Sequence, residues 1–308
     1  MNQNYQSNFE KENCAVTCGG KHALFLSLQA LIETGDEVLV IAPYWVSYPT
    51  MVTLAGGIST IIDTSEEKNW KVTPEQISSA CTSKTKVLIL NNGSNPTGVL
   101  YSRDEIKNIL KVASEKNLIV ISDEVYSGLT YDNAEYISVS SFSEYKESSI
   151  VIQSVSKHFA MTGWRVGFVL GPKKLIEVIE TLQSQTTTGT SSISQWAAVA
   201  AFHNREVQKE IHREMQTRRD HFVENFEKFL QVKITPPECG LYAFLPLSYF
   251  TSSTLDSVSF CLKVLKECNV AFVPGSPFGK EGYVRASFGG KPEEIEMALS
   301  ELSRYLKR

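Results

Sequence analysis

Short runs of apolar residues, rich in β-branched side chains, recur through the first half of the chain and alternate with amphipathic stretches. The runs are apolar at nearly every position, which is typical of strands that helices cover on both faces. They lie at 38–42, 58–63, 86–92, 118–124, 149–156 and 166–171. Strands that alternate with helices predict an α/β protein with a mostly parallel sheet.

The pattern changes near Ser191. From 191 to 232 the residues predict one long helical stretch with a break near Asn204, and Pro236-Pro237 then interrupts the chain. We expect a large domain over 14–212 and a small C-terminal α+β domain over 213–308, with 1–13 as the remnant of an N-terminal region. The small domain should contain strands near 241–246, 270–273 and 282–287 and helices near 254–268 and 291–307.

The composition argues against two classes of binding partner, nucleic acid and membrane. The 308 residues carry a net charge of -4, which gives no electrostatic footprint for nucleic acid or for an anionic membrane surface. The polar start lacks a signal-peptide core, and no uncharged apolar run reaches the roughly 18 residues that a membrane span needs. We therefore expect a cytoplasmic protein that acts on small molecules.

The cysteines do not indicate a metal centre. Six are scattered along the chain, and Cys14 and Cys18 have no second pair of ligands to complete a zinc site. We interpret them as reduced thiols and predict no metal site.

Polar residues that can carry chemistry follow three of the predicted strands. Asn95-Pro-Thr-Gly98, Asp123-Glu-Val-Tyr126 and Ser154-Val-Ser-Lys157 each stand at or just after a strand end. Ligands of open α/β sheets bind beyond the carboxyl ends of the strands, so we expect these segments to form one site.

Lys157 is the centre of that site. Ser154 and Ser156 supply hydroxyl groups and Arg165 supplies a planar guanidinium, which together suit a phosphate monoester. A lysine amine beside a phosphate site is what a Schiff base with pyridoxal 5'-phosphate requires.

Two further residues fit this cofactor. Its ring withdraws electrons only while the ring nitrogen stays protonated, so a carboxylate must face that nitrogen in a dry site, and Asp123 ends an apolar strand. Tyr126 follows three residues later and can hydrogen-bond the ring hydroxyl.

These segments, with Met-Thr-Gly-Trp-Arg-Val-Gly at 161–167 and Val-Arg-Ala-Ser-Phe at 284–288, resemble the signature blocks of class I/II pyridoxal-phosphate-dependent aminotransferases. The resemblance runs from about Cys14 to the C-terminus and is nearest to the bacterial aspartate, or aspartate/prephenate, branch. It implies fold type I: a large domain on a seven-stranded, mostly parallel sheet with helices on both faces, and an active site at a homodimer interface.

The resemblance also assigns roles. Lys157 matches the Schiff-base lysine, Asp123 the partner of the pyridine nitrogen and Arg165 a phosphate ligand. Tyr126 and Asn95 match the partners of the ring hydroxyl. Gly19-Gly20-Lys21 matches the phosphate-binding turn, Trp45 the aromatic residue that stacks on the cofactor ring, and Arg285 the arginine that binds the substrate α-carboxylate. The resemblance therefore implies substrate contacts for Trp45, Asn95 and Arg285. His22 and His158 receive no role.

The chain departs from the pattern in two places. The family carries a longer N-terminal segment, with a tyrosine that reaches the partner subunit's phosphate, so we expect weak assembly of the 308-residue chain. Gly93 stands where proline is more usual and predicts a looser turn before Asn95. The expected reaction is transamination between an amino acid, aspartate in the first place, and 2-oxoglutarate. The alternatives are β-elimination on the same cofactor and an inactive fragment.

Overall fold

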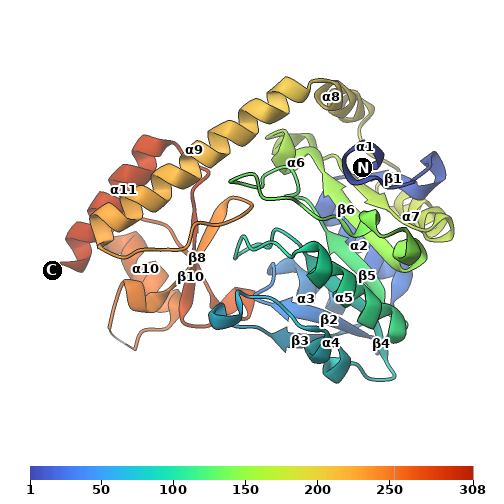
Figure 1. The fold of residues 1–308 in the computed structure, drawn as a ribbon, viewed down its shortest axis with the longest axis horizontal. Helices are drawn as coiled ribbons and strands as arrows, with labels where there is room; N and C mark the ends of the chain where they lie inside the picture. The colour runs from blue at the N-terminus through green and yellow to red at the C-terminus, as the bar shows by residue number, and fades with distance from the viewer. Residues whose placement is uncertain (253, 308) are drawn as a thin grey trace.

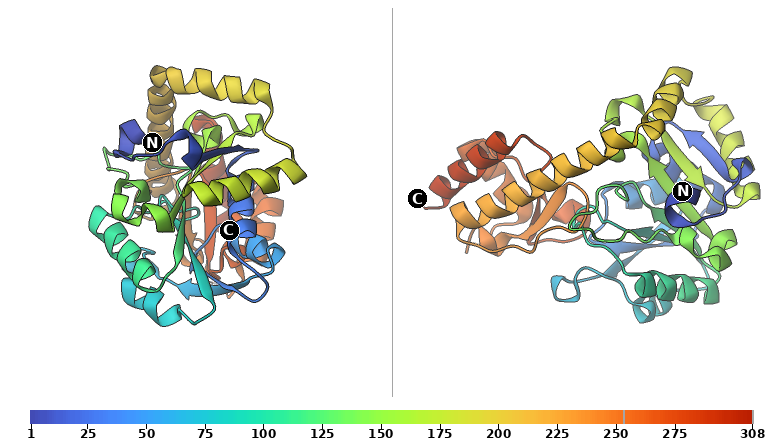
Figure 2. Two further views of the ribbon diagram at one scale, coloured as in Figure 1. Left: turned by 90° about the vertical axis from the view of Figure 1, so that its right-hand side faces the viewer. Right: turned by 45° about the horizontal axis from the view of Figure 1, so that its top comes forward.

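The computed structural model describes residues 1–252 and 254–307. These form two lobes joined by one long helix, with the N-terminus in the larger lobe and the C-terminus at the far end of the smaller one (Figures 1 and 2). Within the described ranges, no helix is both long and apolar enough to cross a membrane.

The larger lobe is built on a seven-stranded sheet of order β1-β7-β6-β5-β4-β2-β3. β7 runs antiparallel to both of its neighbours, while the remaining pairs are parallel. The predicted seven-stranded, mostly parallel sheet is therefore confirmed. The strands are β1 (Cys14–Thr17), β2 (Glu37–Ala42), β3 (Ile58–Asp63), β4 (Thr85–Asn91), β5 (Ile119–Asp123), β6 (Ser149–Ser154) and β7 (Gly167–Leu170).

Helices cover both faces of this sheet, as the apolar strands require. Alternate residues of a strand point to opposite faces, so Val38 and Val40 pack into one core while Leu39 packs into the other. The first core contains α2 (Gly20–Leu31), α3 (Ser47–Leu54) and α7 (Lys173–Thr186), and the second contains α4 (Pro74–Ala80) and α5 (Arg103–Glu115). Short helices α1 (Asn2–Tyr5) and α6 (Val155–His158) complete the lobe.

The break expected near Asn204 is present. α8 (Ser192–His203) ends there, and the Asn204 side chain accepts a hydrogen bond from the N–H of Val207 to cap α9 (Arg205–Leu230). α9 runs from the large lobe into the small one (Figure 1). A division at 212/213 falls inside this helix, and the two domain ranges stay a proposal.

The small lobe is a three-stranded antiparallel sheet of order β8-β10-β9 with helices packed against it. Its core joins Phe226 of α9 to Val264 and Leu302. The strand expected at 270–273 is shorter and later, because only Val273 and Pro274 pair with β10. The elements are β8 (Tyr242–Pro246), β9 (Val273–Pro274), β10 (Tyr283–Ser287), α10 (Ser257–Cys268) and α11 (Pro292–Leu306).

Turns of 3-10 helix fill several connections. They are Lys11–Asn13, Glu66–Lys68, Val139–Ser141, Ser143–Ser148, Thr162–Trp164, Leu247–Tyr249 and Ser276–Phe278.

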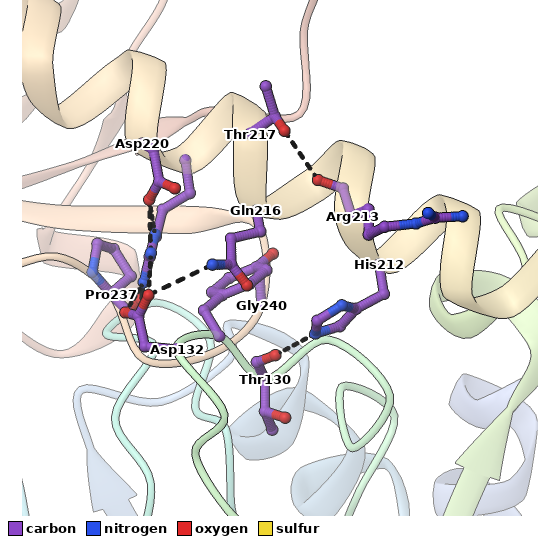
Figure 3. A network of polar contacts seen from close by, with 11 residues as sticks. Thr130, Asp132, His212, Arg213, Gln216, Thr217, Asp220, Pro237 and Gly240 are labelled. Atoms are coloured by element: carbon purple, nitrogen blue, oxygen red, sulfur yellow. Dashed lines mark hydrogen bonds and ion pairs between the residues drawn. The ribbon is translucent and has the colours of Figure 1, made fainter.

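A polar network fastens α9 to the loop that follows β5 (Figure 3). Arg219, only 3% exposed, donates two parallel hydrogen bonds to the Asp132 carboxylate at 2.6 and 2.8 Å. Gln216 also donates to Asp132, and His212 contacts the carbonyl of Thr130. The loop is therefore held by side chains of a helix that belongs to both lobes.

Candidate active site

The three motif segments meet at one edge of the sheet. β4, β5 and β6 are adjacent and parallel, so their carboxyl ends are neighbours. Asp123 ends β5, Ser154 ends β6, and Lys157 lies in the single helical turn α6 that follows. The segment with Asn95 follows β4 and is tied to β5 by Asn91, whose side-chain N–H₂ donates to the Asp123 carbonyl at 2.9 Å and whose oxygen accepts from the Asn95 N–H at 2.9 Å.

Asp123 is a buried carboxylate at the end of β5. It is 5% exposed, and burial raises its pKa to about 6, against which two hydrogen bonds act. The Tyr48 hydroxyl donates to one oxygen at 2.8 Å and the Val125 N–H donates to the other at 3.3 Å. Among the described residues, no cation pairs with this carboxylate, which leaves room for a positively charged group of a ligand.

Lys157 and Tyr126 face each other. The Lys157 Nζ lies 6.0 Å from the centre of the Tyr126 ring, and both side chains are at least partly buried. Burial, first of all, raises the pKa of Tyr126 well above its usual range, so its hydroxyl keeps its proton and can donate. The Tyr242 ring packs edge-on against Tyr126, with centroids 6.3 Å apart.

Arg285 reaches this group from β10 of the small lobe. Its Nη1 donates to Asn95 Oδ1 at 2.9 Å, and its guanidinium lies 4.0 Å from the Tyr242 ring centre and 4.9 Å from that of Phe278. Within the described ranges the buried Nε of Arg285 has no hydrogen-bond partner. An unpaired donor on a held guanidinium suits an incoming carboxylate.

An anion cradle lies at the start of α2. A Cβ added to Gly19 would stand 2.5 Å from Nη2 of Arg165, so glycine leaves room for the guanidinium beside the turn. Gly19 also has φ +91°, a conformation that side chains disfavour. The first N–H groups of α2, from Gly20 and Lys21, have no acceptor within the helix and carry the positive end of its dipole.

The two serines differ in how their hydroxyls are used. Ser154 Oγ accepts from the Ser156 N–H and bonds to the Val166 carbonyl at 3.0 Å, which makes Ser154 the cap of α6. Ser156 Oγ bonds only to Ser154 Oγ, at 2.8 Å, within the described part of the chain. Ser156 is the freer of the two toward a phosphate.

Trp45 packs against Tyr48, whose hydroxyl donates to Asp123. The rings of Trp45 and Tyr48 meet edge to face at 5.5 Å, and the Lys21 Nζ lies 4.6 Å from the Trp45 ring centre. The Trp45 side chain is partly exposed.

These residues fit pyridoxal phosphate. A buried carboxylate without a cation, an amine facing a tyrosine, and a glycine-floored cradle with a guanidinium correspond to the ring nitrogen, the aldehyde and the phosphate of that molecule. A cavity of about 740 Å³ lies beside this group, and Ser154 is the one predicted site residue among those that line it.

Sequence reasoning missed four residues near the site. Tyr48, Asn91, Tyr242 and Phe278 hold Asp123, Asn95 or Arg285 in place. Tyr48 and Asn91 stand inside or beside recognised motifs, and their polar side chains in apolar surroundings were the available signal. Tyr242 and Phe278 come from distant segments of the small lobe, and no local pattern connects them to the site.

Comparisons with known proteins agree with the family resemblance of the sequence motifs. The family model "Aminotransferase class I and II" matches residues 1–302. An aspartate aminotransferase of Bacillus sp. (strain YM-2) is 36% identical over 306 residues, which cover 98% of this chain and 78% of that protein. An aspartate/prephenate aminotransferase of Thermus thermophilus is 36% identical over 300 residues, covering 96% of this chain and 76% of that protein.

Solved structures give the same result. An aspartate aminotransferase of Thermotoga maritima superposes with a TM-score of 0.93 at 34% identity, covering 100% of this chain and 79% of that one. An aromatic aminotransferase of Pyrococcus horikoshii also reaches 0.93 at 34% identity, covering 99% of this chain and 82% of that one. With its sheet order, its strand-end motifs and these relatives, the chain belongs to the class I and II aminotransferases.

Proposed function

We propose that this enzyme binds pyridoxal 5'-phosphate through Lys157 and transfers the amino group of an amino acid to a 2-oxo acid. The observation that carries the proposal is the Asp123 carboxylate, which is 5% exposed and has no cation beside it among the residues that the structure describes. Burial of a carboxylate without a partner costs several kcal/mol by order of magnitude, so such a group indicates a bound cation. Bound pyridoxal phosphate would supply a protonated ring nitrogen there and an electron sink for the charge that forms at the substrate Cα.

Each residue then has a stated task. Asp123 holds the proton on the ring nitrogen, and Tyr48 holds Asp123. Tyr126 and Asn95 donate hydrogen bonds to the ring hydroxyl oxygen. The Lys157 amine, whose Nζ lies 6.0 Å from the Tyr126 ring centre, would be the base that takes the proton from the substrate Cα.

The remaining residues bind and orient. Arg165, Ser154 and Ser156 hold the phosphate together with the N–H groups of Gly20 and Lys21. Trp45 covers the ring and excludes water. Arg285 binds the α-carboxylate, a group that every amino acid and every 2-oxo acid presents, and its unpaired Nε supports this role.

Aspartate with 2-oxoglutarate is the proposed substrate pair. The names of the Bacillus and Thermus relatives, each 36% identical to this chain, support aspartate. The Pyrococcus neighbour is named for aromatic substrates at a similar identity of 34%, which makes an aromatic amino acid the comparison to measure.

We also propose a cytoplasmic homodimer. α8 exposes a run of large apolar side chains, with Ile193 and Trp196 each 74% exposed, and exposed aromatic surface of this kind marks an interface. A second copy of the chain is the proposed occupant.

The test has two arms. Borohydride reduction of the cofactor-loaded chain, followed by peptide mass spectrometry, should place a pyridoxyl group on Lys157, and Lys157→Ala should lose it. Oxaloacetate formation from aspartate and 2-oxoglutarate should exceed transfer from phenylalanine. A pyridoxyl group on another lysine would disprove the assignment of Lys157, and pyruvate release without a 2-oxo acid would favour elimination over transamination.

A further inference from the structure

His158 lies directly after Lys157 and contacts the loop that follows Tyr126. The N–H of Gly128 donates to His158 Nε2 at 3.1 Å, and the Ser127 hydroxyl lies 3.3 Å from the same nitrogen. Gln153 Nε2 donates to Ser127 Oγ at 3.0 Å, and the Ser127 hydroxyl also contacts the Tyr5 side chain. His158 Nε2 is therefore the acceptor at the centre of a small network.

The contact is built for a neutral imidazole. Burial lowers the pKa of His158 to about 4, so at neutral pH its Nε2 is an unprotonated acceptor and the ring proton is on Nδ1. A Cβ added to Gly128 would lie 3.0 Å from His158 Cγ and 3.1 Å from Cδ2. A side chain at 128 would press against the ring, so glycine suits this close approach of the backbone N–H.

This network is next to Tyr126 and Lys157 in the chain. Gly128 is two residues after Tyr126, and His158 is one residue after Lys157, whose Nζ is 6.0 Å from the Tyr126 ring centre. α6 has only four residues, and a single helical turn is not stable by itself. Its orientation depends on contacts to other segments.

We propose that His158 is a positioning residue, which fixes Lys157 opposite Tyr126 by accepting the hydrogen bond of the Gly128 N–H. The inference rests on the proposed role of Lys157 and deepens it. His158 itself touches neither cofactor nor substrate. It sets the separation and direction of two groups that do.

The chain offers a matched control. His212 also contacts this loop through a ring nitrogen, at the Thr130 carbonyl, but it belongs to α9 and not to α6 (Figure 3). Loss of either histidine loosens the same loop. Only loss of His158 also releases the turn that carries Lys157.

The main measurement uses the full chain without cofactor. The rate at which an amine-reactive reagent modifies Lys157 at one fixed pH is followed by mass spectrometry of the Lys157 peptide. His158→Leu should change this rate by about fivefold or more, because displacement of the Lys157 amine places it in different surroundings. His158→Gln keeps a hydrogen-bond acceptor, and its rate should stay within about twofold of the wild-type rate. His212→Leu should also stay within about twofold.

A second variant covers a failure of His158→Leu to fold. Gly128→Ala pushes the loop from the imidazole and keeps every polar group, and it should change the Lys157 rate in the same direction. In the loaded enzyme, His158→Leu and Gly128→Ala should lower kcat by about tenfold or more with little change in KM for the amino acid.

Two results would overturn the proposal: wild-type modification of Lys157 in folded His158→Leu or Gly128→Ala, or an equal change in His212→Leu. Because the labelling needs no cofactor, failure of the chain to bind pyridoxal phosphate would count against the proposed function alone.

Discussion

Arg285 Nη1 and Asn95 Oδ1 form a 2.9 Å hydrogen bond that joins the small lobe to the loop after β4. The bond links the residue proposed to bind the α-carboxylate to a residue proposed to contact the cofactor.

Arg285→Lys should raise KM for aspartate by about 10- to 100-fold, because an ammonium group cannot reproduce two parallel hydrogen bonds to a carboxylate. Cofactor affinity, measured by fluorescence titration, should change by less than about twofold. A KM equal to that of the wild type would place the carboxylate elsewhere.

Asp123→Asn should stabilise the cofactor-free protein at neutral pH. Burial raises the folded-state pKa of Asp123 to about 6 from 3.8, so the stability it contributes is present below about pH 4 and is lost as the pH rises through 6. Removing the charge should raise the free energy of unfolding at pH 7 by about 1–2 kcal/mol, less than the roughly 3 kcal/mol of a two-unit shift because the new amide needs an acceptor.

Urea unfolding of wild type and variant at pH 7 and near pH 4 measures this difference, which should shrink at the lower pH. Glu124→Gln is the control, since burial also raises the pKa of Glu124, to about 7, while its carboxylate bonds to Ser122 and Val139. Both variants should gain stability, but only Asp123→Asn should lose cofactor affinity. Equal affinity in the two variants would contradict the role of Asp123.

Lys280→Met should loosen the contact between the lobes. The Lys280 Nζ bonds to both oxygens of Asp63, at 2.9 and 3.1 Å, and to the Thr64 carbonyl at 2.8 Å. Asp63 is well exposed, so the pair is worth about 0–1 kcal/mol, and the visible effect should be a KM for aspartate raised by about two- to fivefold. Lys233 is an exposed lysine of the same lobe, and Lys233→Met should leave the KM for aspartate unchanged. An equal rise in KM in this control would refute the role of Lys280 in the contact between the lobes.

Trp196→Glu should convert the proposed dimer to a monomer, because a carboxylate would be buried where an apolar ring, now 74% exposed, meets the partner. Light scattering of both chains at matched concentration gives the molar mass. Met297→Glu, at a 63% exposed position on α11, should not change it. A monomeric wild type would show that α8 has no such partner.

The sequence predicted those structural features that depend on residues close together in the chain. Continuous apolar runs predicted six strands of the large sheet, and a hydroxyl at Ser102 with Glu105 three residues later predicted the start of α5. β1 escaped notice because its four residues, Cys-Ala-Val-Thr, are too short a run to show a clear period in the sequence.

The site was predictable only in part, for the same reason. Lys157 and Asp123 stand in motifs whose order along the chain can be recognised. The contacts that hold them cannot be read locally: Tyr48 meets Asp123 across 75 positions, and Gly128 meets His158 across 30. His158 received no role from the sequence, because a histidine after a lysine has no pattern of its own until the fold brings the Gly128 N–H to it.

Helix α9 has a mechanical consequence for the enzyme. Its 26 residues form a rod about 39 Å long. The rod is anchored to the loop after Tyr126 through His212 and in the small-lobe core through Phe226, about 21 Å farther along the axis. A tilt of about three degrees at the first anchor displaces the second by roughly 1 Å over that length. The helix thus works as a lever, by which a slight adjustment beside the cofactor-binding edge is magnified into travel of the strand that carries Arg285.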